Sequence, residues 1–215
     1  VNGHPNAGAI HVLYGFFSDG LSTQYDEVWN QDTGTLGSNA EDNDYFGRTL
    51  ASGDFDGDGC DDLAIGVPYE TWNLGNAGIV QVLYGTGNGF TDTGSQLWRQ
   101  GANGLPESEN IGDQFGEALA VGDFDHDGYD DLAIGASNED FEGTTTRYDV
   151  GVVHILYGTD SGLTATDTQF WHQDLSGLLD DAEQYDAFGH ALVAADFDGD
   201  GYDDLAIGVP GEDVG

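Results

Sequence analysis

Positive charge is almost absent from this sequence. It contains no lysine, and its three arginines stand against 41 acidic residues, which gives a formal net charge of −38. Such a chain repels the phosphates of nucleic acids and of anionic membranes, so we expect neither as a partner. High acidity is typical of proteins that work in high salt, where ions screen self-repulsion. Simple solubility is the alternative, and both interpretations stay open.

Cysteine and long apolar segments are scarce as well. Cys60 is the single cysteine, which excludes an internal disulfide framework. No apolar stretch approaches the roughly 20 residues of a transmembrane helix, so the sequence predicts no insertion into a membrane. No signal peptide is recognisable and the chain starts with Val1 instead of methionine, so we expect a processed or excised chain.

What the sequence does contain is an acidic loop of nine residues in three copies. The copies read D-F-D-G-D-G-C-D-D, D-F-D-H-D-G-Y-D-D and D-F-D-G-D-G-Y-D-D, at Asp54–Asp62, Asp123–Asp131 and Asp196–Asp204. Each copy follows a segment that begins with Phe-Gly, and each precedes Leu-Ala-Ile-Gly.

The residue types in this loop suit a hard cation such as Ca2+. Aspartates at positions 1, 3, 5 and 9 converge on one point, position 7 offers its carbonyl oxygen, and glycine at position 6 allows a sharp turn. Without a cation, four carboxylates within nine residues repel one another. Three copies in register therefore predict three calcium sites. Weak sites of this kind suit the millimolar calcium found outside cells, so an extracellular location is favoured.

The repeat extends well beyond the acidic loop. The loops start 69 and 73 residues apart, and four short segments recur in each unit: the Phe-Gly segment, Asp-Leu-Ala-Ile-Gly, a segment ending in Leu-Tyr-Gly, and a Trp-x-Gln strand. They are rich in β-branched and aromatic residues and bounded by Gly or Asp, and helical periodicity is absent. We predict a single all-β region over 1–215, with units at approximately 1–45, 46–114, 115–187 and 188–215.

Four strands in a unit of this length are typical of a β-propeller blade. A stacked β-solenoid is the alternative, although its rungs are usually shorter. The prediction is therefore blades of four antiparallel strands, in which calcium holds the turn between the first and second strands.

The order Phe-Gly, D-x-D-x-D-G-x-x-D, Leu-Ala-Ile-Gly-x-Pro resembles the FG-GAP repeat of integrin α-subunit β-propellers. Fungal and bacterial propeller lectins and many bacterial surface proteins look similar, and the resemblance covers essentially the whole chain. The Ala-Pro dipeptide of the family is replaced by Val67-Pro68 and Val209-Pro210, and by Ala136-Ser137 in the middle copy.

The resemblance implies that four carboxylates and one backbone carbonyl bind Ca2+ in each loop. The implied ligands are Asp54, Asp56, Asp58, Asp62 and the Cys60 carbonyl; Asp123, Asp125, Asp127, Asp131 and the Tyr129 carbonyl; and Asp196, Asp198, Asp200, Asp204 and the Tyr202 carbonyl. The aspartates at position 8 are expected to point outward or to cap neighbouring backbone: Asp61, Asp130 and Asp203.

The number of units departs from the family, because integrin-type propellers have seven blades and this chain has three repeats. We expect a partial propeller or half of a closed ring, since open sheet edges need strand partners. More of the same fold would supply those partners, either through continuation in a longer chain or through head-to-tail self-association of copies.

Two further sets of residues are candidates for ligand contact. Trp72 lies between a second and a third strand, outside the recurring tryptophan position, and is the candidate aromatic for an unknown protein or glycan ligand. A polar residue recurs in the third strand, as His11, Gln81 and His154. It lines a shared ligand surface or, as we favour, faces solvent or a neighbouring blade.

Catalysis has little support in the sequence. It contains no Gly-x-Ser-x-Gly, no zinc-type His/Cys spacing and no phosphate-cradling loop. We therefore expect a non-catalytic, extracellular, calcium-binding module for adhesion or protein assembly. A carbohydrate-binding lectin propeller and an accessory domain of a secreted enzyme are the alternatives.

Overall fold

The computed structural model describes residues 3–17, 20–72, 75–141 and 147–213, and these residues form twelve strands and no helix. The strands are β1 (Ile10–Phe16), β2 (Gly20–Trp29), β3 (Thr49–Gly53), β4 (Asp62–Val67), β5 (Ile79–Tyr84), β6 (Thr91–Trp98), β7 (Ala118–Gly122), β8 (Asp131–Ala136), β9 (Val152–Tyr157), β10 (Thr164–Trp171), β11 (Ala191–Ala195) and β12 (Asp204–Gly208). A membrane-spanning helix is accordingly not found in this part of the chain.

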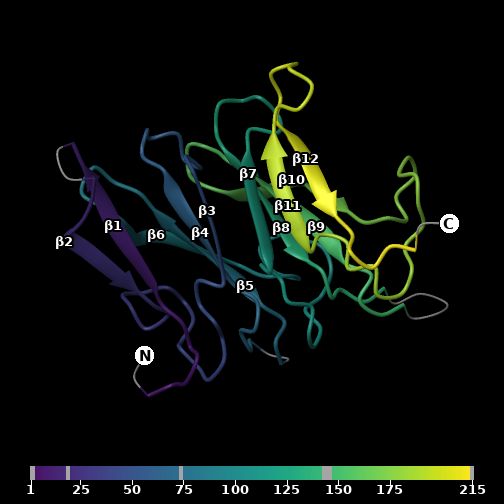
Figure 1. Ribbon diagram of the computed structural model, residues 1–215, viewed down its shortest axis with the longest axis horizontal. Helices are drawn as coiled ribbons and strands as arrows, with labels where there is room; N and C mark the ends of the chain where they lie inside the picture. Colours follow the sequence, from purple (N-terminus) through teal and green to yellow (C-terminus); the bar gives the residue numbers. More distant parts are fainter. Residues whose placement is uncertain (1–2, 18–19, 73–74, 142–146, 214–215) are drawn as a thin grey trace.

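The strands form four antiparallel sheets that follow one another along the chain (Figure 1). β3 to β6 make one four-stranded sheet and β7 to β10 another, each in chain order, while β1–β2 and β11–β12 are two-stranded. The first strand of each sheet contacts the first strand of the next: β3 contacts β7, and β7 contacts β11. The sheets therefore lie beside one another, as the blades of a propeller do. The all-β prediction is confirmed, and the described sheets do not close into a ring.

Register in the first hairpin of each unit fixes where the acidic loop lies. β3 pairs with β4, β7 with β8 and β11 with β12 in one common register. In each pair the residue before the loop lies opposite the last aspartate of the loop: Gly53 opposite Asp62, Gly122 opposite Asp131, and Ala195 opposite Asp204. All three loops therefore close the same end of their hairpins.

Apolar side chains from successive blades pack against each other and form the core. Val80 and Val82 of β5 share one buried cluster with Leu132 and Ile134 of β8, and Phe115 of the Phe-Gly dipeptide belongs to the same cluster. Each of these residues is fully buried. Burial of apolar area contributes about 25 cal/mol per Å2, so the contact between blades is a main source of stability.

The fourth strand is shorter than the sequence suggested. β2, β6 and β10 end at Trp29, Trp98 and Trp171, so the glutamine of each Trp-x-Gln motif lies beyond the strand. The physical reason is a contact with the following blade, because each glutamine side chain donates a hydrogen bond to a glutamate 39 residues later.

Candidate metal centres

The first acidic loop gathers three carboxylates. Asp54, Asp56 and Asp58 each offer an oxygen, and these oxygens lie within 4.8 Å of one another. Amides of the loop bind the same side chains: the Gly59 N–H donates to Asp54 Oδ2 at 3.0 Å and the Cys60 N–H to Asp58 Oδ1 at 2.8 Å. Gly59 has a φ of 89°, the left-handed conformation that the turn requires. Backbone and side chains thus hold the carboxylates on one side of the loop.

The second and third loops are wound in the same way. The grouped carboxylates are Asp123, Asp125 and Asp127 in the second loop and Asp196, Asp198 and Asp204 in the third. Asp200 lies outside the third group, although its Oδ1 accepts the Tyr202 N–H at 3.0 Å as position 5 does in the other loops. Nine of the twelve predicted carboxylates therefore lie in these groups, and positions 1 and 3 are grouped in every loop.

The aspartate at position 9 is anchored to the backbone in the two complete blades. Asp62 accepts the Phe55 N–H at 2.9 Å and the Gly85 N–H at 2.8 Å, and the side chain is fully buried. Asp131 does the same with the amides of Phe124 and Gly158. Neither belongs to the groups above, although a carboxylate that accepts two amides keeps further lone pairs for a cation.

Electrostatics in the loops favour an added positive charge. Burial raises the pKa of Asp62 and of Asp131 to about 7, and neighbouring loop carboxylates add to the rise. The pKa of Asp56 is raised as well, first by burial and then by the charges of Asp58 and Asp54. In the described chain no arginine or histidine pairs with a loop aspartate. A bound cation reverses this effect, because it favours the ionised form of every carboxylate around it.

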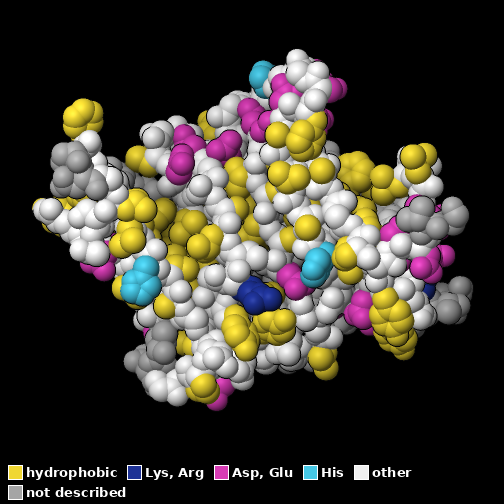
Figure 2. All heavy atoms as spheres, viewed as in Figure 1, with side chains coloured by type: hydrophobic (Ala, Val, Ile, Leu, Met, Phe, Trp, Pro, Cys, Tyr) yellow, Lys and Arg dark blue, Asp and Glu magenta, His cyan; other side chains and the backbone are white. Residues whose placement is uncertain are grey.

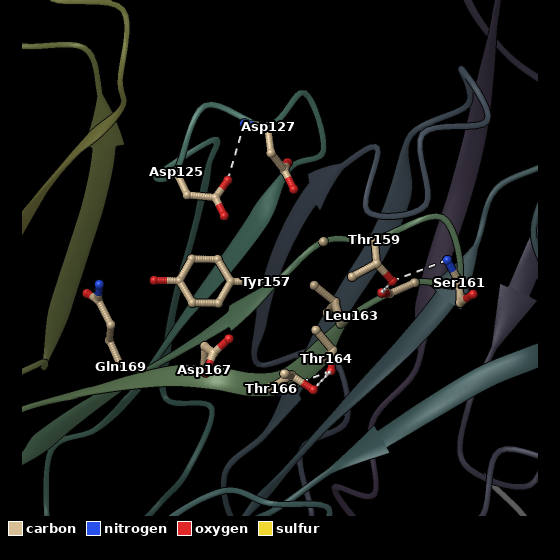
Figure 3. Close-up of a pocket in the computed structure, with 12 residues that line it drawn as sticks. Asp125, Asp127, Tyr157, Thr159, Ser161, Leu163, Thr164, Thr166, Asp167 and Gln169 are labelled. Carbon is tan, nitrogen blue, oxygen red and sulfur yellow. Dashed lines mark hydrogen bonds between the residues drawn. The ribbon is translucent and has the colours of Figure 1, made fainter.

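The donor set fits a hard divalent cation. It consists of oxygen atoms only, which Ca2+ prefers, and Asp54 Oδ1 is buried without a hydrogen-bond partner among the described residues. Figure 3 shows Asp125 and Asp127 projecting from the second loop beside Tyr157 of β9. The hollow they line has a volume of about 730 Å3.

The family model of the FG-GAP repeat matches residues 46–83, 115–156 and 188–215, which together make up half of the chain. The chain belongs to the FG-GAP repeat family. Each matched segment of this FG-GAP chain runs from a Phe-Gly dipeptide through an acidic loop.

The FG-GAP chain is also similar to curated proteins of two kinds. It is 35% identical over 175 residues to integrin alpha-PS2 of Drosophila melanogaster, covering 80% of this chain and 11% of that protein. It is 34% identical over 217 residues to integrin alpha pat-2 of Caenorhabditis briggsae, covering 94% and 16%. It is 34% identical over 166 residues to phosphatidylinositol-glycan-specific phospholipase D of Rattus norvegicus, covering 77% and 18%. The chain thus spans less than a fifth of the length of these relatives.

Successive FG-GAP loops are joined by side chains that sequence reasoning did not assign to a site. The Asp54 N–H donates to Asp130 Oδ2 at 2.8 Å, and the Asp123 N–H donates to Asp203 Oδ2 at 3.1 Å. Position 8 therefore caps the preceding loop, which was one of its two predicted roles. The recurrence of an aspartate at position 8 was the available signal, but the sequence alone did not identify its partner.

Position 7 also reaches back to the preceding loop through its side chain. The Tyr202 ring lies 5.1 Å from the ring of His126, and the ring of Tyr129 lies so close to Gly57 that a Cβ there would meet it. Gly57 and His126 both occupy position 4 and both have positive φ. Ligation by the position 7 carbonyls stays a prediction, as does the complete ligand set of each loop.

Trp72 lies outside the metal loops, at the edge of a hollow of about 200 Å3 that Glu41 and Glu70 also line. Its side chain is 39% exposed. The Arg99 guanidinium lies 5.1 Å from the centre of its ring, which is cation–π distance. A ligand that stacks on this face must displace Arg99, and the role of Trp72 in ligand contact stays a prediction.

Proposed function

We propose that this chain is part of an extracellular, calcium-binding β-propeller module that acts in adhesion or protein assembly and has no catalytic role. The observation that carries the proposal is the convergence of carboxylates in three equivalent loops, joined one to the next through position 8. Calcium would supply the positive charge that these loops lack. Similarity to integrin α-subunits, which are cell-surface proteins, supports the adhesion part.

A second candidate function is an accessory domain of a secreted enzyme. The similarity to phosphatidylinositol-glycan-specific phospholipase D favours it, because that relative carries a stretch similar to these repeats. In both cases the FG-GAP blades would bind a ligand or position another part of the protein. Any catalysis would take place outside these blades.

We also propose that the two-stranded sheets are completed by more of the same fold. Leu13 of β1 is 43% exposed, whereas its counterparts Leu83 and Leu156 in the complete blades are fully buried. Val193 of β11 is 55% exposed, whereas its counterpart Ala120 is 7% exposed. Strands of a second copy, or of the same polypeptide, would cover these residues. Light scattering distinguishes the two sources, since only the first gives a mass above that of the monomer.

Calcium removal tests the central part of the proposal. We expect EDTA to lower the melting temperature markedly, because each site contributes about 2.7 kcal/mol when free calcium is 100 times its dissociation constant. We expect Asp127→Ala to reduce the number of calcium ions bound from three to two in a calorimetric titration. The control is Asp26→Ala, which removes an exposed charge from β2 away from the loops. An unchanged melting temperature in EDTA, with no metal in the purified protein, overturns the proposal.

A further inference from the structure

A glutamine–glutamate pair recurs at each of the three junctions between sheets in the described chain, and it is buried in the first two. The glutamine lies two residues beyond the fourth strand of one blade, and the glutamate lies in the turn after the second strand of the next. The pairs are Gln31–Glu70, Gln100–Glu139 and Gln173–Glu212, each separated by 39 residues. Because the same contact occurs at the same place three times, it is a regular feature of the interface between blades.

The middle pair is the most enclosed. Gln100 is 1% exposed and Glu139 is fully buried. The Gln100 Nε2–H donates to Glu139 Oε2 at 2.5 Å. The two remaining oxygens, Gln100 Oε1 and Glu139 Oε1, are also buried, and neither has a hydrogen-bond partner among the described residues. An ionised carboxylate has no proton to offer, so an ionised Glu139 would leave both oxygens unsatisfied.

One proton on Glu139 Oε1 satisfies both atoms. A protonated carboxyl donates an O–H, and the amide oxygen of Gln100 accepts it. Together with the existing N–H···O bond, this closes a cyclic acid–amide pair with two hydrogen bonds. A buried polar group without a hydrogen-bond partner destabilises the fold, so the protonated arrangement is favoured.

The surroundings also favour the proton. The charged groups that act on Glu139 are Asp113, Glu107 and Asp140, and all are carboxyl groups. Burial, followed by the charge of Asp113, raises the pKa of Glu139 to about 9.

The other two pairs share this negative environment. Burial and the charges of Asp44 and Glu41 raise the pKa of Glu70 to about 7. The pKa of Glu212, which faces Asp180 and Asp186, is raised as well, first by burial. Glu212 is only partly buried, because no complete blade covers it.

We propose that these pairs are acid–amide locks, in which a protonated glutamate of one blade is bonded to a glutamine of the preceding blade, so that contact between blades depends on pH. The proposal is independent of calcium binding, because neither member of a pair belongs to an acidic loop. Protonated pairs stabilise the contact between blades in mildly acidic solution, and this stabilisation is lost in alkaline solution.

The direction of the pH dependence follows from proton linkage. In the unfolded chain Glu139 ionises near its ordinary pKa of about 4.3, whereas in the folded chain it keeps its proton up to about pH 9. The stabilisation is full below the unfolded pKa and is lost as pH rises toward the folded one. The unfolding constant of the wild type therefore rises by up to about tenfold per pH unit from this group alone.

Glu139→Gln tests the proposal at saturating calcium. Glutamine keeps the cyclic arrangement as an amide pair but has no proton to lose. We expect the ratio of unfolding constants, wild type over variant, to rise with pH between about 5 and 9. The control is Glu183→Gln, which removes an exposed carboxyl and leaves this ratio constant. A constant ratio for Glu139→Gln would overturn the proposal, whatever its absolute stability.

Two further measurements separate a lock from a merely structural residue. Exchanging the partners, with Gln100→Glu and Glu139→Gln together, restores one acid and one amide, so the pH dependence should return. An infrared band of a protonated carboxyl group should be present in the wild type at pH 7 and weaker in Glu139→Gln. If the exchange leaves the ratio constant, or if the band is equal in both proteins, the lock does not exist.

Discussion

Asp130 and Asp54 bind each other through their backbones and one side chain, although they belong to different blades. The Asp54 N–H donates to Asp130 Oδ2 at 2.8 Å, and the Asp130 N–H donates to the Asp54 carbonyl oxygen at 3.1 Å. Asp123 and Asp203 repeat this reciprocal contact one blade later. The first residue of the first and of the second acidic loop is thereby hydrogen-bonded to the eighth residue of the following loop, so neighbouring loops are joined.

We expect Asp130→Ala to lower the free energy of unfolding by about 1–3 kcal/mol, because it leaves the partly buried Asp54 amide without an acceptor. Asp61→Ala is the matched control: it occupies the same loop position, is exposed, and has no preceding loop in the described chain. Its expected effect is within about 0.5 kcal/mol. Urea denaturation in saturating calcium measures the free energy of unfolding of both variants. Equal effects would contradict a stabilising contact between neighbouring loops.

Gly78 is predicted to be intolerant of any side chain. Its φ is 85°, and a Cβ there would overlap the backbone of Phe115, whose N–H donates to the Ala77 carbonyl at 2.9 Å. Gly78→Ala should therefore cost about 2 kcal/mol or more, from backbone strain and displacement of the Phe-Gly turn. Gly87→Ala should be nearly neutral, because no atom lies within 4 Å of its added Cβ. The melting temperatures of the two variants are the measurement. An equal change in both would contradict this prediction.

His154 is expected to make the fold sensitive to acid. Its ring is fully buried between Phe115 and Phe170, with centroid distances of 5.5 and 4.9 Å, and burial lowers its pKa to about 3. As pH falls below about 6.5, the imidazole of His154 takes up a proton in the unfolded chain, whereas the buried imidazole of the folded chain stays neutral. Stability from this group is therefore lost progressively on acidification toward pH 3, by up to about 1.4 kcal/mol per pH unit.

His154→Gln should remove that loss, because the counterpart Gln81 is equally buried and donates to the Gln96 carbonyl at 2.8 Å. The measurement is the slope of unfolding free energy against pH between about 6 and 4, which should become shallower. His11→Gln, at the same repeat position but exposed, should leave the slope unchanged. An identical slope in wild type and His154→Gln would show that the buried imidazole does not control acid stability.

The sequence predicts the strands and loops well because their signals are local. Short segments rich in apolar and β-branched residues, bounded by Gly or Asp, specify the strands without reference to the rest of the chain. The Asp-x-Asp-x-Asp-Gly spacing likewise specifies a loop whose side chains meet, and the structure brings Asp54, Asp56 and Asp58 together. Local pattern and local geometry agree here.

Contacts between blades were less accessible to sequence reasoning. A glutamine and a glutamate recur at the positions of Gln100 and Glu139 in each unit, which singles both positions out. Their contact, however, depends on how one blade packs on the next. The position of His154 shows the same limit: strand alternation does not say whether a polar residue faces solvent or a neighbouring sheet. Its complete burial decides against the solvent interpretation for this copy.

The charge of the chain leads to a last prediction, that monovalent salt stabilises the fold even when calcium is saturating. Acidic side chains are spread over the face seen in Figure 2, well beyond the loops, and the net charge is −38. At about 10 mM salt the Debye length is about 30 Å, so these charges repel across the whole surface, whereas near 0.15 M it falls to about 8 Å. We expect the melting temperature to rise most steeply over that range, as screening removes the repulsion. Sucrose at matched osmolality is the control, since it does not screen charge. A melting temperature that stays flat or falls as NaCl is added would count against a salt-adapted surface.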